Sequence, residues 1–252
     1  MVDKLRKRVS SESVADRVMT QIYSPTGSTI EHTGQSSLAV SIEGHDFLLL
    51  AKRGLYWPAL RTLFIADTHF GKEATFRSQG VAVPRGSTRG TLSTIARMIS
   101  ECQASRLILL GDMFHARSSI SQDVRQSLDA FFVEHEQLRF TLVLGNHDRG
   151  VPALIKNWPI EIVESGTSVG SLSISHFPQE PSPETNLLLC GHLHPAFYFS
   201  SKSDSVGKLP CFWLSKRQLV LPAIGEFTGT QIIKPRRSDQ TWVIVDDQIV
   251  RV

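Results

Sequence analysis

The chain has 252 residues, of which 41% are hydrophobic and 20% are charged. These values are close to the average for globular proteins and exclude collagen-like, low-complexity and disulfide-scaffold classes. The formal net charge of +3 permits an anionic partner without requiring one. Cys102, Cys190 and Cys211 lack paired spacing and predict free thiols rather than disulfides or a thiolate zinc site.

Residues 1–35 are polar and irregular, which predicts a loosely held N-terminal arm before a single domain over residues 36–252. The basic run Lys4–Arg8 is followed by polar residues, where a secretion signal needs an apolar stretch. The longest apolar run, Phe47–Ala51, is far shorter than a membrane span. We therefore expect a cytoplasmic protein with no membrane segment.

Short, continuous apolar runs recur along the chain and are typical of strands buried on both faces. They lie at Phe47–Leu50, Leu63–Ala66, Leu107–Leu110, Leu142–Leu144 and Leu187–Cys190. Helical spacing of apolar residues occurs over Leu92–Cys102 and over Val124–Phe132, and Ser121 is a candidate N-cap of the second helix.

This alternation predicts an α/β protein with parallel strands joined by crossover helices. Four later segments predict shorter strands of a mixed sheet: Leu172–Ser175, Phe212–Leu214, Leu219–Leu221 and Trp242–Val245.

Polar residues follow four of the apolar runs directly. The four clusters are Asp67-Thr68-His69, Gly111-Asp112, Gly145-Asn146-His147-Asp148 and Gly191-His192-Leu193-His194. Because the carboxyl ends of strands in open α/β sheets face a common crevice, we expect these clusters to converge.

The chemistry of these clusters is that of a metal site. Oxygen and nitrogen ligands without sulfur suit Mn²⁺, iron or Zn²⁺. A carboxylate can bridge two ions, and Asp112 is the natural bridge. Each cluster alone has an ordinary alternative, since an aspartate at a strand end is usually a cap or a turn residue. The combination of four clusters in this order favours the metal site.

The ordered combination D-x-H, GD, GNHD and GHLH resembles the pattern of the calcineurin-like metallophosphoesterase family over Asp67–His194. This resemblance implies mixed β-sheets packed between helices, with the metal site at the C-terminal ends of strands. It also implies two divalent metal ions, with Mn²⁺ as the first expectation and iron or Zn²⁺ as alternatives.

Carried over residue by residue, the resemblance also implies the ligands. One metal is assigned Asp67, His69, Asp112 and His194, and the other is assigned Asp112, Asn146, His176 and His192. His176 takes the place of the lone histidine of the family pattern, and His147 is implied as the catalytic histidine that binds no metal.

Further segments are similar to the bacterial ligase-associated metallophosphoesterases. They are Tyr56–Pro58, Phe70–Lys72, Gly80–Gly86, Gly191–Pro195, Cys211–Trp213 and Leu221–Gly229. This resemblance implies an endonuclease or phosphodiesterase of DNA repair that works with an ATP-dependent DNA ligase, a helicase and an exonuclease. Thr68, Ile224 and Thr230 depart from the pattern, but none of them is a ligand position.

Several residues near the predicted ligands are candidates for supporting roles. Contacts with substrate phosphates are expected of five residues, with solvated surface residues as the alternative for most of them: Lys72, Arg77, Arg85, Arg117 and Arg149. Arg149, directly after the GNHD turn, is counted with the catalytic residues. Asp148 either orients an imidazole or caps the following segment. His115, three residues after Asp112, can reach the site, but a hydrogen-bonded structural histidine is the more common alternative.

Three functions follow from these patterns. The first is a dinuclear metal phosphodiesterase that acts on DNA. The second is a phosphomonoesterase or cyclic-nucleotide phosphodiesterase on the same scaffold, because the metal centre fixes the reaction and not the substrate. The third is a non-catalytic scaffold of a DNA ligase-associated repair complex.

Overall fold

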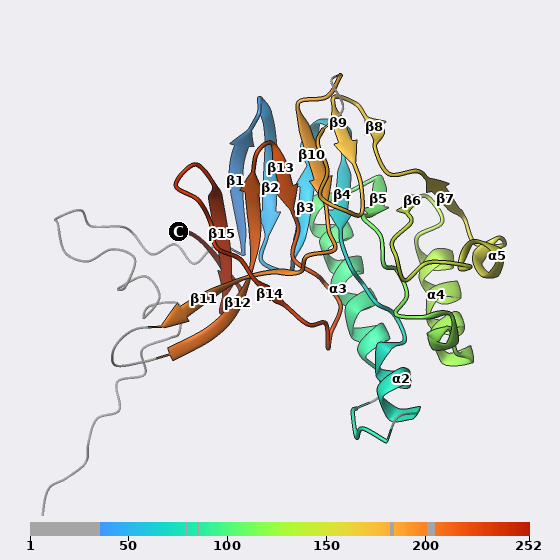
Figure 1. The fold of residues 1–252 in the computed structure, drawn as a ribbon. Coiled ribbons are helices and arrows are strands. Elements are labelled where there is room, and N and C mark those ends of the chain that lie inside the picture. Colours follow the sequence, from blue (N-terminus) through green and yellow to red (C-terminus); the bar gives the residue numbers. More distant parts are fainter. Residues whose placement is uncertain (1–35, 79, 85, 182–183, 201–204) are drawn as a thin grey trace, which may run out of the picture.

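The structure is a computed structural model that describes residues 36–78, 80–84, 86–181, 184–200 and 205–252. Two mixed β-sheets lie face to face, and helices cover the outer side of the first sheet (Figure 1). The predicted α/β class is confirmed. The predicted arm, residues 1–35, lies outside the described residues.

The first sheet contains seven strands in chain order. They are β1 (Ser37–Ile42), β2 (His45–Leu50), β3 (Gly54–Trp57), β4 (Thr62–Ile65), β5 (Arg106–Leu109), β6 (Arg139–Val143) and β7 (Ile160–Val163). β1 to β4 pair antiparallel, whereas β4 to β7 pair parallel. Four of the five principal apolar runs therefore form strands of this sheet, as predicted.

Six helical segments of the described chain lie in the connections from β3 to β7. They are η1 (Pro58–Leu60), α2 (Lys72–Ser78), α3 (Ser87–Cys102), η2 (Arg117–Ser119), α4 (Gln122–Glu134) and α5 (Pro152–Ile155). Both predicted helices are present as α3 and α4. Ser121 caps α4 as predicted, because its side chain accepts a hydrogen bond from the backbone N–H of Val124.

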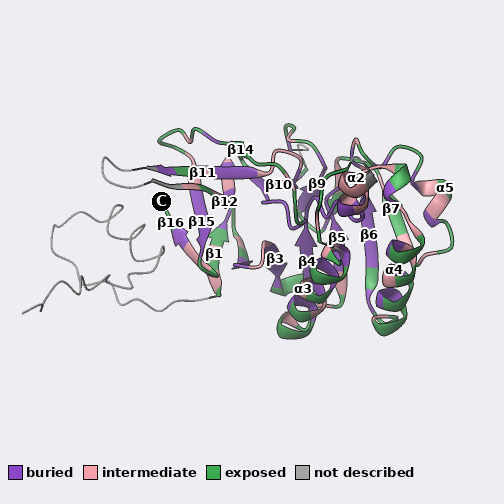
Figure 2. Ribbon diagram, turned by 90° about the horizontal axis from the view of Figure 1, so that it is seen from below, coloured by how far each residue is buried: buried purple, intermediate pink, exposed green. Residues whose placement is uncertain are grey.

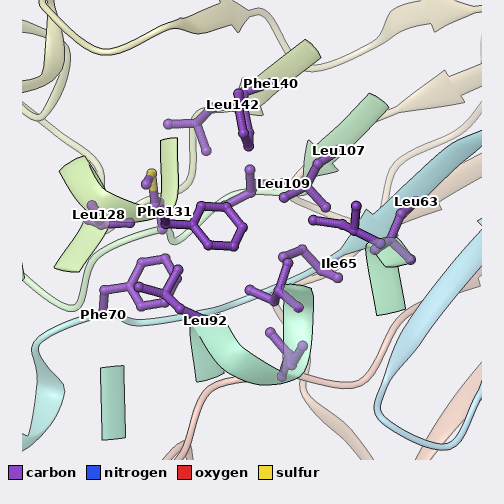
Figure 3. Packing of buried hydrophobic residues seen from close by; sticks show 14 of the residues in the cluster. Leu63, Ile65, Phe70, Leu92, Leu107, Leu109, Leu128, Phe131, Phe140 and Leu142 are labelled. Atoms are coloured by element: carbon purple, nitrogen blue, oxygen red, sulfur yellow. The ribbon is translucent and has the colours of Figure 1, made fainter. Parts of the chain in front are cut away.

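One hydrophobic core lies between the first sheet and these helices. Alternate residues of β4 and β5 point towards this side, where Leu63, Ile65, Leu107 and Leu109 pack with Phe131 of α4 (Figure 3). Figure 2 shows the outer sides of α3 and α4 exposed and the strands largely buried.

The second sheet contains nine strands. They are β8 (Thr167–Val169), β9 (Leu172–Ile174), β10 (Leu187–Cys190), β11 (Pro195–Ser200), β12 (Ser205–Ser215), β13 (Gln218–Val220), β14 (Gln231–Ile232), β15 (Gln240–Val245) and β16 (Gln248–Arg251). The main path runs β14-β11-β12-β13-β10-β9-β8, and β15 joins β12 to β16. β10 pairs parallel with both β9 and β13.

A second core fills the space between the two sheets. Phe64 and Ile108, which alternate with residues of the helix-facing core, pack there with Leu189 and Phe212 of the second sheet. Strands buried on both faces explain the continuous apolar runs.

The arrangement of the layers differs from the sequence expectation in two respects. The run Leu187–Cys190 belongs to a second sheet rather than to one mixed sheet with the earlier runs. The outer side of the second sheet is packed by strand residues such as Phe199, Cys211 and Val243, with no helix over it in the described ranges. The helices therefore cover one outer face of the sandwich.

Two simpler expectations concern cysteines and membrane segments. All three cysteines are free, as predicted, and Cys190 and Cys211 are buried. Within the described part of the chain, no helix has the length and apolar character needed to cross a membrane.

Candidate metal centre

The carboxyl ends of strands from both sheets meet at one place and bring the predicted ligands together. Two groups of side chains have ligand atoms that lie within 4.8 Å of one another. The first is Asp67, His69 and His194, and the second is Asp112, His176 and His192. These are six of the seven residues predicted as ligands, and the seventh, Asn146, contacts the second group.

The first group contains buried atoms that make no hydrogen bond. Asp67 Oδ1 and both ring nitrogens of His69 are buried and unpartnered. His194 Nε2 approaches Asp67 Oδ1 to 3.2 Å, while Asp67 Oδ2 accepts a hydrogen bond of 2.9 Å from the backbone N–H of His192. Buried polar atoms without partners are rare and indicate a missing ligand such as an ion.

The second group surrounds Nε2 of His176, which is fully buried. This nitrogen lies 3.0 Å from Asn146 Oδ1, 3.1 Å from His192 Nδ1 and 3.5 Å from Asp112 Oδ2. Four potential ligand atoms thus converge from loops that follow β5, β6, β9 and β10.

Hydrogen bonds at the far side of two rings fix which nitrogen faces the centre. His176 Nδ1 lies 2.9 Å from the carbonyl oxygen of Leu110, and His194 Nδ1 lies 2.9 Å from that of Gly229. A carbonyl oxygen only accepts, so Nδ1 carries the proton, and a neutral ring presents a lone pair at Nε2. Metal-binding histidines typically have such a carbonyl partner.

Those lone pairs face other acceptors. Nε2 of His176 points at the amide oxygen of Asn146, and Nε2 of His194 points at the carboxylate of Asp67. Two acceptors at these distances repel each other unless a proton or a metal ion lies between them. The oxygen and nitrogen donor set, the unpartnered atoms and these opposed acceptors fit divalent metal ions.

Asp112 lies between the two groups. Its Oδ2 is 3.5 Å from His176 Nε2 in the second group and 3.9 Å from His69 Nε2 in the first. Its Oδ1 accepts a hydrogen bond of 2.9 Å from the backbone N–H of His147. The Asp112 carboxylate thus has both groups within 4 Å of one oxygen.

The backbone of the ligand loops adopts an uncommon conformation. Five of the candidate ligands have positive φ angles: Asp67 at 55°, His69 at 44°, Asp112 at 50°, His192 at 70° and His194 at 47°. Left-handed backbone is uncommon for residues other than glycine and gathers at functional sites.

The glycines of the motifs have a steric role. A Cβ atom at Gly145 would clash with Oδ1 and the backbone nitrogen of Asp112, and one at Gly111 would clash with the ring of His176. The strand-end loops therefore pack against the ligand side chains so closely that only glycine fits.

Burial lowers the pKa of two candidate ligand histidines and so favours the neutral, metal-binding form of their rings. Burial and the imidazole of His194 lower the pKa of His69 to about 2. Burial and His176 also lower the pKa of His192. Burial opposes protonation of His194, but the Asp67 carboxylate outweighs it and raises the pKa of that ring.

His147 lies at the mouth of the centre with 40% of its side chain exposed, so it can reach a substrate. Its Nε2 is 4.0 Å from Asp112 Oδ2. Its ring packs against that of His115, with centroids 5.3 Å apart and planes 25° apart.

His115 lies beside the centre, which is one of the two alternatives that the sequence left open. Its ring centroid is 5.7 Å from that of His69, and its Nδ1 is buried without a hydrogen-bond partner. A structural histidine normally has such a partner. In the sequence, the one feature that links His115 to the site is its position three residues after Asp112.

Asp148 is fully buried and ties two ligand loops together. Its carboxylate accepts hydrogen bonds of 3.0 Å, 3.2 Å and 3.3 Å from the backbone N–H groups of Gly145, Phe114 and Met113. Burial raises the pKa of Asp148, although these three bonds oppose the shift. These three donors all precede Asp148 in the chain, so the contacts match neither the orientation of an imidazole nor the capping of the following segment; the carboxylate joins two ligand loops instead.

Replacing Asp148 by alanine is therefore expected to lower the free energy of unfolding by about 2–4 kcal/mol, because three buried N–H groups lose their acceptor. Asp148→Asn keeps a carbonyl oxygen in the same place and should cost less. Urea denaturation of the metal-free protein measures both. Alanine and wild-type proteins of equal stability would show that the carboxylate does not hold the loops.

The predicted phosphate-binding residues lie at different distances from the centre. Lys72 begins α2, three residues after His69, and burial lowers its pKa while the Asp112 carboxylate opposes that shift. Arg77 donates a hydrogen bond to the carbonyl oxygen of Pro84. Arg117, on η2, and Arg149 are exposed. The charge of Lys72 acts on His69 and His194 of the first group and on Asp112 of the second. Arg85 lies outside the described residues.

The chain was compared with protein families and with solved structures. Residues 60–245 match the family model described as calcineurin-like phosphoesterase. The chain is similar to the crystal structure of the nuclease MPE of Pseudomonas putida, with 29% identity and a TM-score of 0.74, over 86% of this chain and 100% of that chain. A search of the curated proteins found no match.

Two other solved structures are more distant. A protein of unknown function from Aquifex aeolicus has 21% identity and a TM-score of 0.38, over 57% of this chain and 82% of that chain. A phosphoesterase from E. coli has 14% identity and a TM-score of 0.40, over 76% of this chain and 97% of that chain.

The fold and the two His/Asp groups define the class of metal-dependent phosphoesterases. Within that class, the chain belongs to the calcineurin-like phosphoesterase family, as the motifs predicted.

Proposed function

We propose that this protein is a two-metal phosphodiesterase that hydrolyses DNA. The position of Asp112 is the observation that carries the proposal. One oxygen of its carboxylate faces a histidine of each group, at 3.5 Å and 3.9 Å. A carboxylate in that position can hold two ions roughly 3.5–4 Å apart, the spacing used in phosphoryl displacement.

In this proposal, Asp67, His69 and His194 hold one ion with Asp112, and Asn146, His176 and His192 hold the other with Asp112. Two divalent ions there supply Lewis acidity, which neutralises charge on the phosphoryl oxygens and lowers the pKa of the attacking water. The backbone N–H of His147 keeps the Asp112 carboxylate in its bridging position.

His147 is proposed to act on the leaving oxygen. Its exposed imidazole lies next to both groups without belonging to either. An imidazole can donate a proton to an alkoxide as the phosphorus–oxygen bond breaks. His115 packs against this ring and limits its orientation, while Lys72 and Arg149 are proposed to attract phosphate oxygens.

The choice of a phosphodiester is supported by the similarity to a nuclease over all of that chain's length, and the choice of DNA by the motifs of the ligase-associated group. The motifs of the ligase-associated group extend the proposal to a DNA-repair role with an ATP-dependent DNA ligase, a helicase and an exonuclease, in the cytoplasm. Mn²⁺ is the proposed metal, because it accepts mixed carboxylate and imidazole ligands.

A panel of phosphate esters tests this function. Protein loaded with Mn²⁺ is incubated with bis-p-nitrophenyl phosphate, p-nitrophenyl phosphate, supercoiled plasmid and cyclic nucleotides. We expect hydrolysis of the diester and nicking of the plasmid, with slower release from the monoester. EDTA should abolish all turnover, and an Asp112→Asn preparation controls for contaminating nuclease.

Each alternative function predicts a different set of hydrolysed substrates. Turnover of the monoester or of cyclic nucleotides alone would contradict the DNA proposal and favour the second function. Absence of turnover with Mn²⁺, iron and Zn²⁺ would favour the scaffold.

A further inference from the structure

A cavity of about 410 Å³ opens directly beside the first group of metal-binding candidates. His194 forms part of its wall, together with Phe227 and Gly225 of the loop after β13, Lys208 of β12 and Arg53 of the β2–β3 turn. Binding sites for small molecules typically have volumes of about 300–1,000 Å³. The cavity therefore has the size of a ligand subsite that adjoins the metal centre.

The loop that carries Phe227 is fixed to the metal centre. The backbone N–H groups of Ile224 and Gly225 donate hydrogen bonds of 3.0 Å and 3.1 Å to the carbonyl oxygens of Ala66 and Asp67. The carbonyl oxygen of Gly229 accepts the hydrogen bond from His194. Both ends of the loop are thus tied to candidate ligands, so the cavity holds a constant position relative to the site of reaction.

Phe227 combines exposure with an unfavourable backbone conformation. Its φ angle is 57°, in the left-handed region that bulky residues avoid, and 41% of its surface is exposed. Its ring packs edge-on against Phe76 of α2, with centroids 6.3 Å apart. Residues with such backbone conformations cluster at ligand-binding and active sites. The conformation and exposure of Phe227 therefore indicate a binding role.

The cavity also carries positive charge. Lys208 is exposed, and Arg53 is half-buried with one N–H donated to the carbonyl oxygen of Ala223 at 3.1 Å. A guanidinium has five N–H donors, so others remain for an anion. Both cations lie on the same cavity as the exposed ring of Phe227.

Acidic residues limit how far such a site extends. Glu226 and Arg53 line both this cavity and a larger one of about 950 Å³, which Asp246 and Asp247 also line. Carboxylates repel phosphate groups. A phosphate group is therefore expected to bind on the side of the cavity that carries Lys208 and Arg53, and not beyond Glu226 in the larger cavity.

We propose that this cavity is a subsite for one nucleotide of a single strand next to the scissile phosphate, with its base stacked on Phe227 and its phosphate held by Lys208 and Arg53. The inference rests on the proposed function as a DNA phosphodiesterase. Stacking on aromatic rings combined with cationic contacts to the backbone is the usual way to hold single-stranded nucleic acid.

Equilibrium binding tests the subsite separately from turnover. A fluorescein-labelled oligothymidylate of twelve nucleotides is titrated with EDTA-treated protein, and fluorescence anisotropy is measured at several salt concentrations. Phe227→Leu, which keeps an apolar contact with Phe76 but has no aromatic face, should weaken binding about 5- to 100-fold. Phe227→Trp should bind as tightly as the wild-type protein or more tightly.

Lys208→Ala should weaken binding and reduce the slope of log affinity against log salt by about 0.7, the value for one contact with a single-stranded phosphate. Lys156→Ala is the matched control, because Lys156 is exposed at the end of α5 and does not line the cavity. Affinity unchanged by Phe227→Leu and Lys208→Ala would overturn the subsite, and so would an equal loss in Lys156→Ala.

Turnover of bis-p-nitrophenyl phosphate, measured on the same wild-type preparation with Mn²⁺, reports on the proposed function alone. This ester has no nucleotide for the cavity. Failure of the proposed function thus appears as absent turnover, whereas failure of the subsite appears in the binding data.

Discussion

Replacing Asp112 by asparagine is expected to reduce bound Mn²⁺ from two ions per chain to less than one and to lower kcat on a phosphodiester by about 10³-fold or more. The carboxylate loses its charge, and an amide NH2 group replaces Oδ2, the oxygen that faces a histidine of each group, while Oδ1 stays with the backbone N–H of His147. Metal ions supply several kcal/mol of transition-state stabilisation, and about 4 kcal/mol corresponds to a factor of about 10³. Metal analysis after gel filtration and steady-state kinetics measure the two effects.

The substitution changes the charge of residue 112 with little effect on the local structure, because asparagine keeps an oxygen for the hydrogen bond from the backbone N–H of His147. The fold should therefore be preserved, as circular dichroism would verify. Asp46→Asn makes the same chemical change at an exposed position of β2 and should have no effect. Two bound ions and a normal rate in Asp112→Asn would remove the bridging role.

Replacing His147 by alanine is expected to leave both ions bound and to lower kcat by about 10²–10⁴-fold, the usual contribution of a general acid. The imidazole is not a member of either ligand group, and its backbone N–H, which holds Asp112, is unchanged by the substitution.

The leaving group sharpens this second prediction. p-Nitrophenolate leaves without much help from an acid, whereas a sugar alkoxide needs a proton. The loss in His147→Ala should therefore be smaller on bis-p-nitrophenyl phosphate than on an oligonucleotide. Loss of metal from His147→Ala would instead make this residue a ligand, and an unchanged kcat on DNA would exclude it as the acid.

The individual elements of the fold could be predicted from the sequence because they depend on local signals. Apolar runs marked the central strands, and the Ser121 cap marked the start of α4. The family resemblance implied more than one sheet, but the apolar runs alone could not assign a strand to one sheet or the other, because a strand buried on both faces has the same apolar run in either. Leu107–Leu110 and Leu187–Cys190 look alike in sequence, yet they lie in opposite sheets.

Part of the candidate site could also be predicted from local signals in the sequence. Strand-end positions predicted that Asp67, Asp112 and His192 would approach one another, and their ligand atoms fall into two compact groups. Asp148 and His115 were less predictable, because hydrogen bonds to backbone groups and the stacking of rings depend on loop conformation. Phe227 gave no signal beyond its motif, since exposure and a positive φ angle are properties of the folded chain.

Anomalous diffraction from crystals soaked in Mn²⁺ tests the central claim most directly. The account predicts two peaks about 3.5–4 Å apart. One should lie among Asp67, His69 and His194, the other among Asn146, His176 and His192, with Asp112 between them. A single peak elsewhere, or none among these side chains at saturating Mn²⁺, would contradict it.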